Sequence, residues 1–256
     1  MKQPAARVIG RGPRSLGALL LAAPLLLLPS LAVAAPALSN PLAPSGVPAP
    51  ASALQLAMIL GFASLLPAIV LACTCFARFT IVFSFLKTGL GTQGAPPSQV
   101  LVGLALFMTA FVMAPVASRV NEAALAPYFA GALDEQAALD AATPPLRAFL
   151  LRHTRQRDLA LFLSVSGSPR PNNAGEVPLR VCVPAFAVSE LRVAFEMGLI
   201  VLLPFVVIDL AVATILSSLG MMMLPPSVVS LPAKLLVFLA ADGWHLLVES
   251  LLRGMA

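Results

Sequence analysis

The sequence predicts an all-α membrane protein of two kinked helical hairpins, separated by a helical extracytoplasmic insertion. Of the 256 residues, 59% are hydrophobic and only 11% are charged, whereas about a quarter of the residues in soluble domains are charged. The mean hydropathy is +0.94. Long apolar runs alternate with turns rich in glycine and proline, and one turn pattern occurs twice. These observations favour helices associated with a membrane over a soluble globular fold.

The N-terminal 53 residues are predicted to precede the hairpins. Residues 1–35 have the order of a cleavable secretory signal, with four basic residues, an apolar stretch over 16–28 and small residues over 31–35. An uncleaved N-terminal anchor is the alternative. Residues 36–53 are rich in Pro, Ala and Ser, which predicts a flexible linker. The signal holds four of the 16 basic and none of the 11 acidic residues, so the remaining chain is almost neutral and is not expected to bind nucleic acid.

The two predicted hairpins cover residues 54–117 and 179–256, with residues 118–178 as the insertion between them. About 20 apolar residues in a helix span the ~30 Å core of a bilayer. The apolar segments of the hairpins are 54–76, 100–117, 197–219 and 228–252. Proline kinks a helix, and prolines of this kind are Pro67, Pro115 and Pro204.

Basic residues indicate the orientation. Arg78 and Lys87 follow the first apolar segment, and no acidic residue precedes Glu122. Because Lys and Arg accumulate in short cytoplasmic loops, the connection that carries Arg78 and Lys87 is predicted to be cytoplasmic. The insertion then lies in the periplasm, and the turn of the second hairpin lies on the cytoplasmic side.

The turns of the two hairpins share a sequence pattern. Residues 90–100 and 219–229 both contain Leu-Gly, four further residues, Pro-Pro-Ser, one residue and Val. Glycine can end a helix in the left-handed conformation, a proline pair delays the next helix, and Ser98 or Ser227 can cap that helix. Duplication and convergent turn chemistry both explain the match. The predicted turn residues are Gly91, Pro96, Pro97, Gly220, Pro225 and Pro226.

Three consecutive methionines distinguish the second turn from the first. Methionine is unbranched and adaptable, so it can fill an irregular gap and reopen it. At the tip of a membrane hairpin, such a triplet is typical of a deformable seal more than of a rigid core. The residues are Met221, Met222 and Met223.

Charged residues inside the apolar segments are expected to have partners. Asp209 is alone in its segment, where an acid costs roughly 2.5–3.5 kcal/mol on insertion scales. Asp209 and Lys234 lie about 16 Å and 12 Å from the hairpin tip at 1.5 Å per residue, so Lys234 is the natural partner. Glu190 is a second possible partner. A structural charge network is favoured over a proton relay, because no histidine is near.

The sequence contains no pattern typical of an enzyme or a metal site. It has no HExxH, no GxSxG and no phosphate-binding glycine loop. Asp242, His245 and Ser250 follow one another on one predicted helix, which makes a catalytic triad geometrically improbable. The three cysteines suggest neither a disulfide framework nor a metal site. We therefore expect no catalysis, metal or cofactor. A small-solute transporter that uses Asp209 and Lys234, or an intramembrane enzyme, is the alternative class.

Eight sequence blocks, in order, resemble the FliP family of flagellar export proteins. The resemblance extends over about residues 55–253, and the cleavable signal favours this family over its virulence type III secretion counterpart, the SctR-like branch. The blocks are 78–82, 90–97, 154–159, 183–191, 204–210, 220–226, 230–234 and 242–244.

The resemblance implies a core subunit of the flagellar type III export gate, in the bacterial inner membrane at the flagellar basal body. Such chains assemble in several copies with FliQ- and FliR-like subunits, assisted by a FliO-like factor, into a conical helical assembly partly lifted out of the bilayer. FlhA- and FlhB-like proteins deliver unfolded substrates to the channel. The family's methionine loop forms a gasket there, and Met221, Met222 and Met223 match it.

Overall fold

The computed structural model describes residues 58, 60–61, 63–64, 71–92, 94–167, 171, 173–221 and 223–255. The predicted signal, the linker and most of the first apolar segment lie outside the described residues. All regular elements within the described residues are helical, which confirms the all-α prediction. The chain divides into two units, residues 1–67 and 68–256. In the first, the described residues are helical, and Ser64 donates a hydrogen bond to the Gly61 carbonyl at 2.7 Å.

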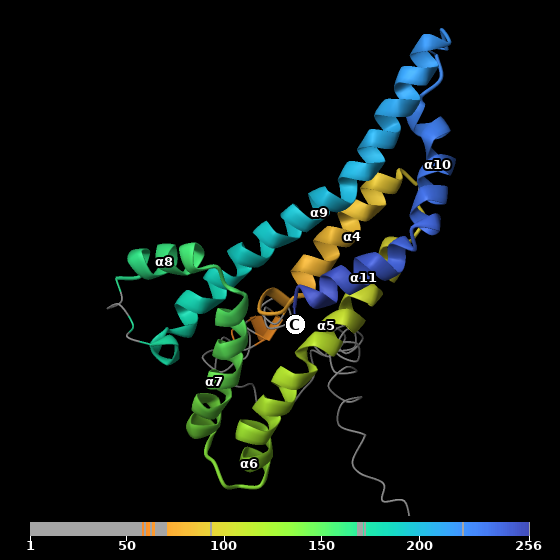
Figure 1. Ribbon diagram of the computed structural model, residues 1–256. Helices are drawn as coiled ribbons and strands as arrows, with labels where there is room; N and C mark the ends of the chain where they lie inside the picture. The colour runs from red at the N-terminus through yellow and green to blue at the C-terminus, as the bar shows by residue number, and fades with distance from the viewer. Residues whose placement is uncertain are drawn as a thin grey trace, which may run out of the picture. The chain divides into compact units, whose positions relative to one another are not determined.

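Two parallel helices form the centre of the second unit (Figure 1). Helix α4 (Phe76–Leu90) lies along α9 (Leu179–Ser218), and both contribute apolar side chains to the core. Glycines let the helices approach closely, because a Cβ at Gly198 would lie 2.4 Å from the Phe85 ring and one at Gly89 would lie 2.5 Å from the Phe205 ring. These two contacts fix the register between α4 and α9.

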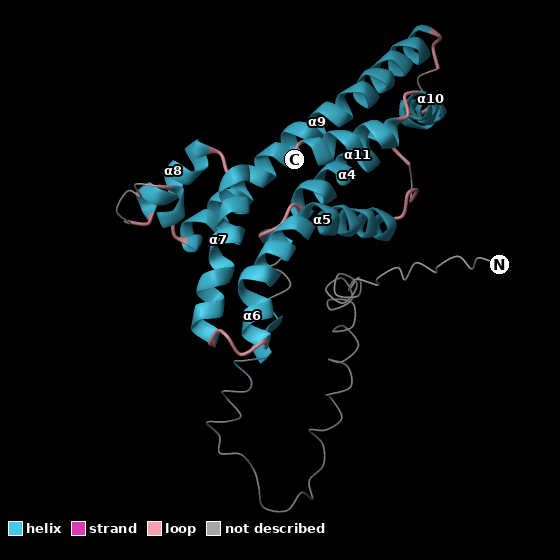
Figure 2. Cartoon of the chain, turned by 60° about the horizontal axis from the view of Figure 1, so that its bottom comes forward, coloured by secondary structure: helices cyan, strands magenta, loops and turns pink. Residues whose placement is uncertain are grey.

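Further helices lie between α4 and α9 in the chain and after α9. Figure 2 shows α5 continuing into α6 and then a loop leading into α7. Helix α7 begins at Asp134, whose side chain accepts a hydrogen bond from the Ala137 N–H at 2.7 Å, an ordinary N-cap. Helices α7, α8 and α10 each pack on α9. The bounds are α5 Ser98–Val120, a π-helical segment Asn121–Leu125, α6 Ala126–Phe129, α7 Glu135–His153, α8 Gln156–Val165, a 3-10 turn Ala174–Glu176, α10 Pro226–Ala240 and α11 Gly243–Arg253.

The connection that carries Arg78 and Lys87 contains helix α4, over residues 76–90. Apolar residues recur there every three or four positions, and Arg78 is only 3% exposed. A basic residue marks a loop only when water solvates it. Here a carboxylate on α9 neutralises Arg78, so the charge no longer prevents burial.

Proline does not end the apolar helices. Helix α5 continues through Pro115, and the 40-residue α9 continues through Pro184 and Pro204. The predicted segment 197–219 is thus only the second half of α9. In membrane helices, neighbouring groups re-satisfy the backbone that proline frees.

The sharpest bend falls at a position that the hydropathy pattern missed. The segment predicted over 228–252 is two helices, α10 and α11, bent by 62°. Asp242 has a left-handed φ of 49° at the bend, a conformation that aspartate tolerates better than most residues. Gly243 follows, and a Cβ there would lie 2.3 Å from the Phe238 ring. The Asp-Gly pair therefore permits the bend.

Two helices of the described residues are long and apolar enough to cross a membrane. They are 98–129 and 179–218, and the bent pair α10 and α11 makes a third if it counts as one span. The fold is thus that of a membrane-associated helical protein.

In both turns a glycine in the left-handed conformation ends the preceding helix. Gly91 and Gly220 have left-handed φ values of 69° and 72°. At the second turn, the Met221 N–H bonds the Leu216 carbonyl at 3.0 Å and the Gly220 N–H bonds the Ser217 carbonyl at 3.2 Å, which is the Schellman arrangement.

The expected serine caps are absent from these turns. The N-cap positions of α5 and α10 are occupied by Pro97 and Pro225, and neither helix start has a side-chain cap hydrogen bond. Ser98 lies one residue too late to cap α5 and instead accepts a hydrogen bond from the Lys87 ammonium at 2.8 Å. Pro96 precedes the cap of α5, and Pro226 is the first residue of α10.

Candidate functional site

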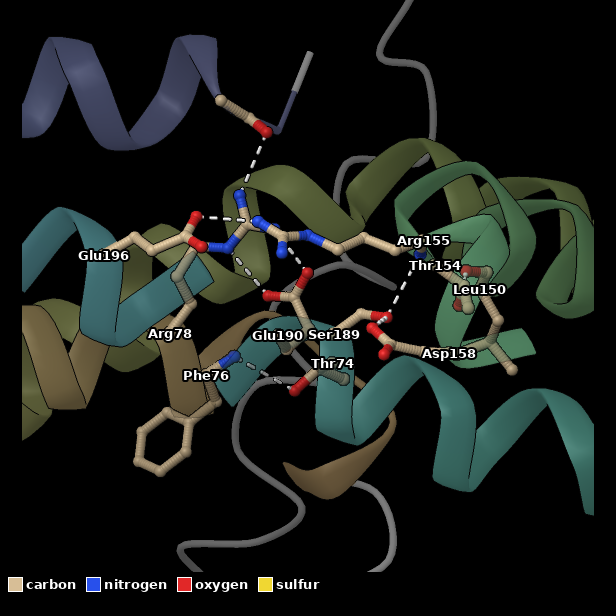
Figure 3. A network of polar contacts seen from close by, with 11 residues as sticks. Thr74, Phe76, Arg78, Leu150, Thr154, Arg155, Asp158, Ser189, Glu190 and Glu196 are labelled. Atoms are coloured by element: carbon tan, nitrogen blue, oxygen red, sulfur yellow. Dashed lines mark hydrogen bonds and ion pairs between the residues drawn. The ribbon is translucent and has the colours of Figure 1, made fainter. Parts of the chain in front are cut away.

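A buried ion pair joins the N-terminal part of α4 to α9 (Figure 3). Arg78 Nε donates to Glu190 Oε2 at 2.8 Å, and a second guanidinium nitrogen contacts Glu190 Oε1. The third nitrogen donates to the Gly254 carbonyl, just after α11, at 3.0 Å. The two side chains are 4% and 1% exposed. One guanidinium therefore holds α4, α9 and the end of α11 together, through a bidentate geometry that suits arginine.

The residue next to Glu190 anchors the corner between α7 and α8 (Figure 3). The buried Ser189 hydroxyl accepts from the Arg155 backbone N–H at 3.1 Å and donates to Asp158 Oδ2 at 2.7 Å. The Arg155 guanidinium also bonds Glu196 at 2.7 Å. Adjacent residues of α9 thus fix the insertion and α4 at the same level of the helix.

His153 lies beside this network at the end of α7. Its ring contacts Phe149, with ring centroids 4.9 Å apart. Burial, together with the positive charges of Arg78 and Arg152, lowers the pKa of His153 to about 4. The imidazole is therefore neutral at physiological pH and adds no further positive charge beside Arg78.

A second buried cation holds the C-terminal end of α4. Lys234 Nζ lies 2.6 Å from Asp209 Oδ2 and 3.0 Å from the Gly89 carbonyl. Ser230, one turn earlier on α10, donates to Asp209 Oδ1 at 2.5 Å. Lys234 is 3% exposed, whereas the Asp209 side chain is 40% exposed. An ammonium at a helix C-terminus also interacts favourably with the helix dipole, so Lys234 caps α4 while it bridges α9 and α10.

The methionine loop stands at the tip of the α9–α10 arm. Met221 is 45% exposed and Met223 is 97% exposed, and Met222 lies outside the described residues. Among the described residues of α9 that follow Phe205, only Leu216 is buried. The loop is thus carried on a helical arm whose apolar side chains have few partners within the chain.

A model of the FliP family matches residues 59–251. The chain belongs to the FliP family. Curated relatives named flagellar biosynthetic protein FliP include that of Bacillus subtilis, 46% identical over 79% of this chain and 92% of that protein. The FliP of Caulobacter vibrioides is 47% identical over 78% of this chain and 77% of its own. The FliP of Pectobacterium carotovorum is 43% identical over 89% of this chain and 88% of that protein.

The match to FliP covers both charge clusters and the methionine loop. Sequence reasoning assigned Glu190 as a possible partner of Lys234, and the structure instead pairs it with Arg78. In the sequence-based interpretation, Arg78 indicated only the orientation of the chain. No function was assigned to Ser189 or Ser230. The sequence did contain a signal for Arg78. A basic residue among apolar neighbours at helical spacing needs a partner, just as Asp209 does. The serines offered no such signal.

The described part of this FliP-family chain shows no metal centre. No group of three or more His, Cys, Asp or Glu side chains is arranged to hold an ion within it. The polar groups gather instead as paired charges and hydroxyls between helices, an arrangement that positions helices.

Proposed function

We propose that the chain is a core channel subunit of the flagellar type III protein export gate, required for export of unfolded flagellar subunits. One observation carries the proposal beyond family membership: the methionine loop ends a helical arm whose apolar surface is left uncovered. Single exposed apolar residues are normal on a protein surface, but a long continuous row marks contact with protein or lipid. The row on α9 contains Leu199, Ile200, Leu203, Val206, Val207, Leu210 and Ile215.

The uncovered arm supports assembly with further subunits. We propose several copies of this chain together with FliQ- and FliR-like subunits, in the bacterial inner membrane at the flagellar basal body. A FliO-like factor assists assembly, and FlhA- and FlhB-like proteins deliver substrates. The relatives are flagellar, so the virulence type III secretion gate is not favoured.

Within such a gate, the two buried charge clusters act as clamps rather than as a proton relay. Each cation bonds a carboxylate and a backbone carbonyl on a different helix. A carbonyl accepts hydrogen bonds and does not carry protons onward. A small-solute transporter would use Asp209 and Lys234 as coupling groups, which requires the pair to separate during transport.

Native mass measurement of the detergent-extracted protein tests the proposal. We expect a large hetero-oligomer that contains several copies of this chain and FliQ- and FliR-like chains. A stable monomer that binds a single solute saturably would contradict the gate and favour a transporter.

The methionine loop provides a prediction of its own. Replacing Met221, Met222 and Met223 together by glycine removes the adaptable side chains that we propose close the channel. Small ions are expected to leak through the assembled gate, measured as membrane conductance above the wild-type level. The matched control is Thr92→Gly, at the aligned position of the first turn, which should leave conductance unchanged. Normal assembly with wild-type conductance in the triple variant would refute the seal.

A further inference from the structure

The interface between α4 and α5 contains a small cleft of mixed character. Its volume is about 160 Å³. Its polar lining comes from Lys87 and from Thr80, Ser84 and Ser98, and its apolar walls come from Phe83, Leu101 and Val102. An ammonium and hydroxyls beside apolar walls suit a ligand with an anionic head and an apolar tail.

Lys87 is the cation in this region without a carboxylate partner. The two buried cations are neutralised, Arg78 by Glu190 and Lys234 by Asp209, whereas Lys87 is only half-buried. No ion pair within the described residues involves Lys87, whose ammonium donates to the Ser98 hydroxyl at 2.8 Å. The sequence offers no acidic residue before Glu122, so neither α4 nor α5 supplies an anion.

The cleft lies at the end of a candidate membrane span. Ser98 is the first residue of the span 98–129, and the hydrogen bond from Lys87 brings the ammonium to that end. Leu106 lies one helical turn further along α5 than Val102, which lines the cleft, and each of the two is 42% exposed. In a helix that spans a bilayer, the end lies at the level of the lipid headgroups, and the exposed apolar face lies at the level of the acyl chains.

We propose that this cleft binds an anionic phospholipid, with the phosphate at Lys87 and Ser98 and an acyl chain along Val102 and Leu106. The charge supports an anion, and the exposed apolar side chains of Val102 and Leu106 favour a lipid over an acidic side chain of a partner protein. The proposal requires the membrane location of the chain and is independent of its role in export.

Native mass spectrometry with defined lipids tests this site. The purified protein is equilibrated with equal amounts of phosphatidylglycerol and phosphatidylcholine of identical acyl chains. We expect about fivefold preferential retention of phosphatidylglycerol, the effect of one lysine near an anionic surface. Lys87→Gln should abolish the preference, and Ser84→Leu should weaken it without changing charge, by filling the cleft.

The matched control is Arg119→Gln, in the same candidate span but near the opposite end of α5. Arg119 is exposed and donates to the Pro115 carbonyl at 3.3 Å, so its loss should leave lipid preference unchanged. An equal effect of Arg119→Gln and Lys87→Gln would overturn the proposal in favour of diffuse charge attraction. Full displacement of the lipid by inorganic phosphate would assign a free-phosphate site instead. Equal retention of both lipids, with Lys87→Gln impairing subunit assembly, would assign an acidic protein partner.

Discussion

Replacing Arg78 by methionine is expected to lower the free energy of unfolding by about 3–5 kcal/mol, the cost of leaving one charge of a buried pair alone. Glu190 is 1% exposed, so water cannot replace the guanidinium, and the Gly254 carbonyl also loses its donor. The readout is the thermal unfolding midpoint of the detergent-solubilised protein, where this cost corresponds to a decrease on the order of 10 °C. Glu190→Gln should have a similar effect, since both partners are buried.

A matched control separates the effect of breaking a buried ion pair from the effect of removing one arginine charge. Arg253 pairs with Glu249 on the surface of α11 at 2.6 Å and is 80% exposed. Arg253→Met should therefore cost less than about 1 kcal/mol. In the double variant Arg78→Met with Glu190→Leu, most of the stability should return, because no unpaired charge remains buried. Equal midpoints for Arg78→Met and Arg253→Met would contradict the buried clamp.

Removing the charge of Asp209 is expected to be more damaging than removing that of Lys234. Asp209→Asn leaves the Lys234 ammonium, which is 3% exposed, without a carboxylate. Its remaining partners are the Gly89 carbonyl and a neutral amide, so the variant should cost about 3 kcal/mol. Lys234→Met leaves a carboxylate that is 40% exposed and keeps its hydrogen bond from Ser230, so the remaining charge is less deeply buried than the ammonium and the cost should be about 1–2 kcal/mol. The midpoints of both variants, and their co-purification with other gate subunits, check the order.

A reversed order would show that a neighbouring subunit covers Asp209 in the assembly. Equal, negligible costs would contradict the clamp itself. Exchanging the two charges is a poor test, because an aspartate at position 234 would face the Gly89 carbonyl, which needs a donor.

The sequence predicted the parts of this fold that depend on local chemistry. Helical apolar segments and the left-handed turns at Gly91 and Gly220 follow from residue type alone. The similar depth of Asp209 and Lys234 also came from counting residues, and in the structure Lys234 Nζ lies 2.6 Å from Asp209 Oδ2.

The features that sequence reasoning missed depend on distant contacts. The burial of Arg78 depends on a carboxylate 112 positions away, at Glu190, and hydropathy along the chain does not show which residue supplies it. Likewise, the bend at Asp242 requires a residue in the left-handed region beside a glycine on which the Phe238 ring packs. An Asp-Gly pair is a recognisable turn signal, but the surrounding apolar residues concealed it.

The unbroken length of α9 makes it a lever. Both ends of α4 are fixed to α9, at Glu190 and at Asp209, while the far end of α9 carries the methionine loop. Asp209 and Met221 are 12 positions apart, which corresponds to about 18 Å along a helix. A tilt of about 12° at Asp209 would displace the loop by about 4 Å over such a length, roughly the width of one side chain. We propose that small rearrangements at the Asp209–Lys234 pair are amplified at the tip, where a change of that size would open or close the seal.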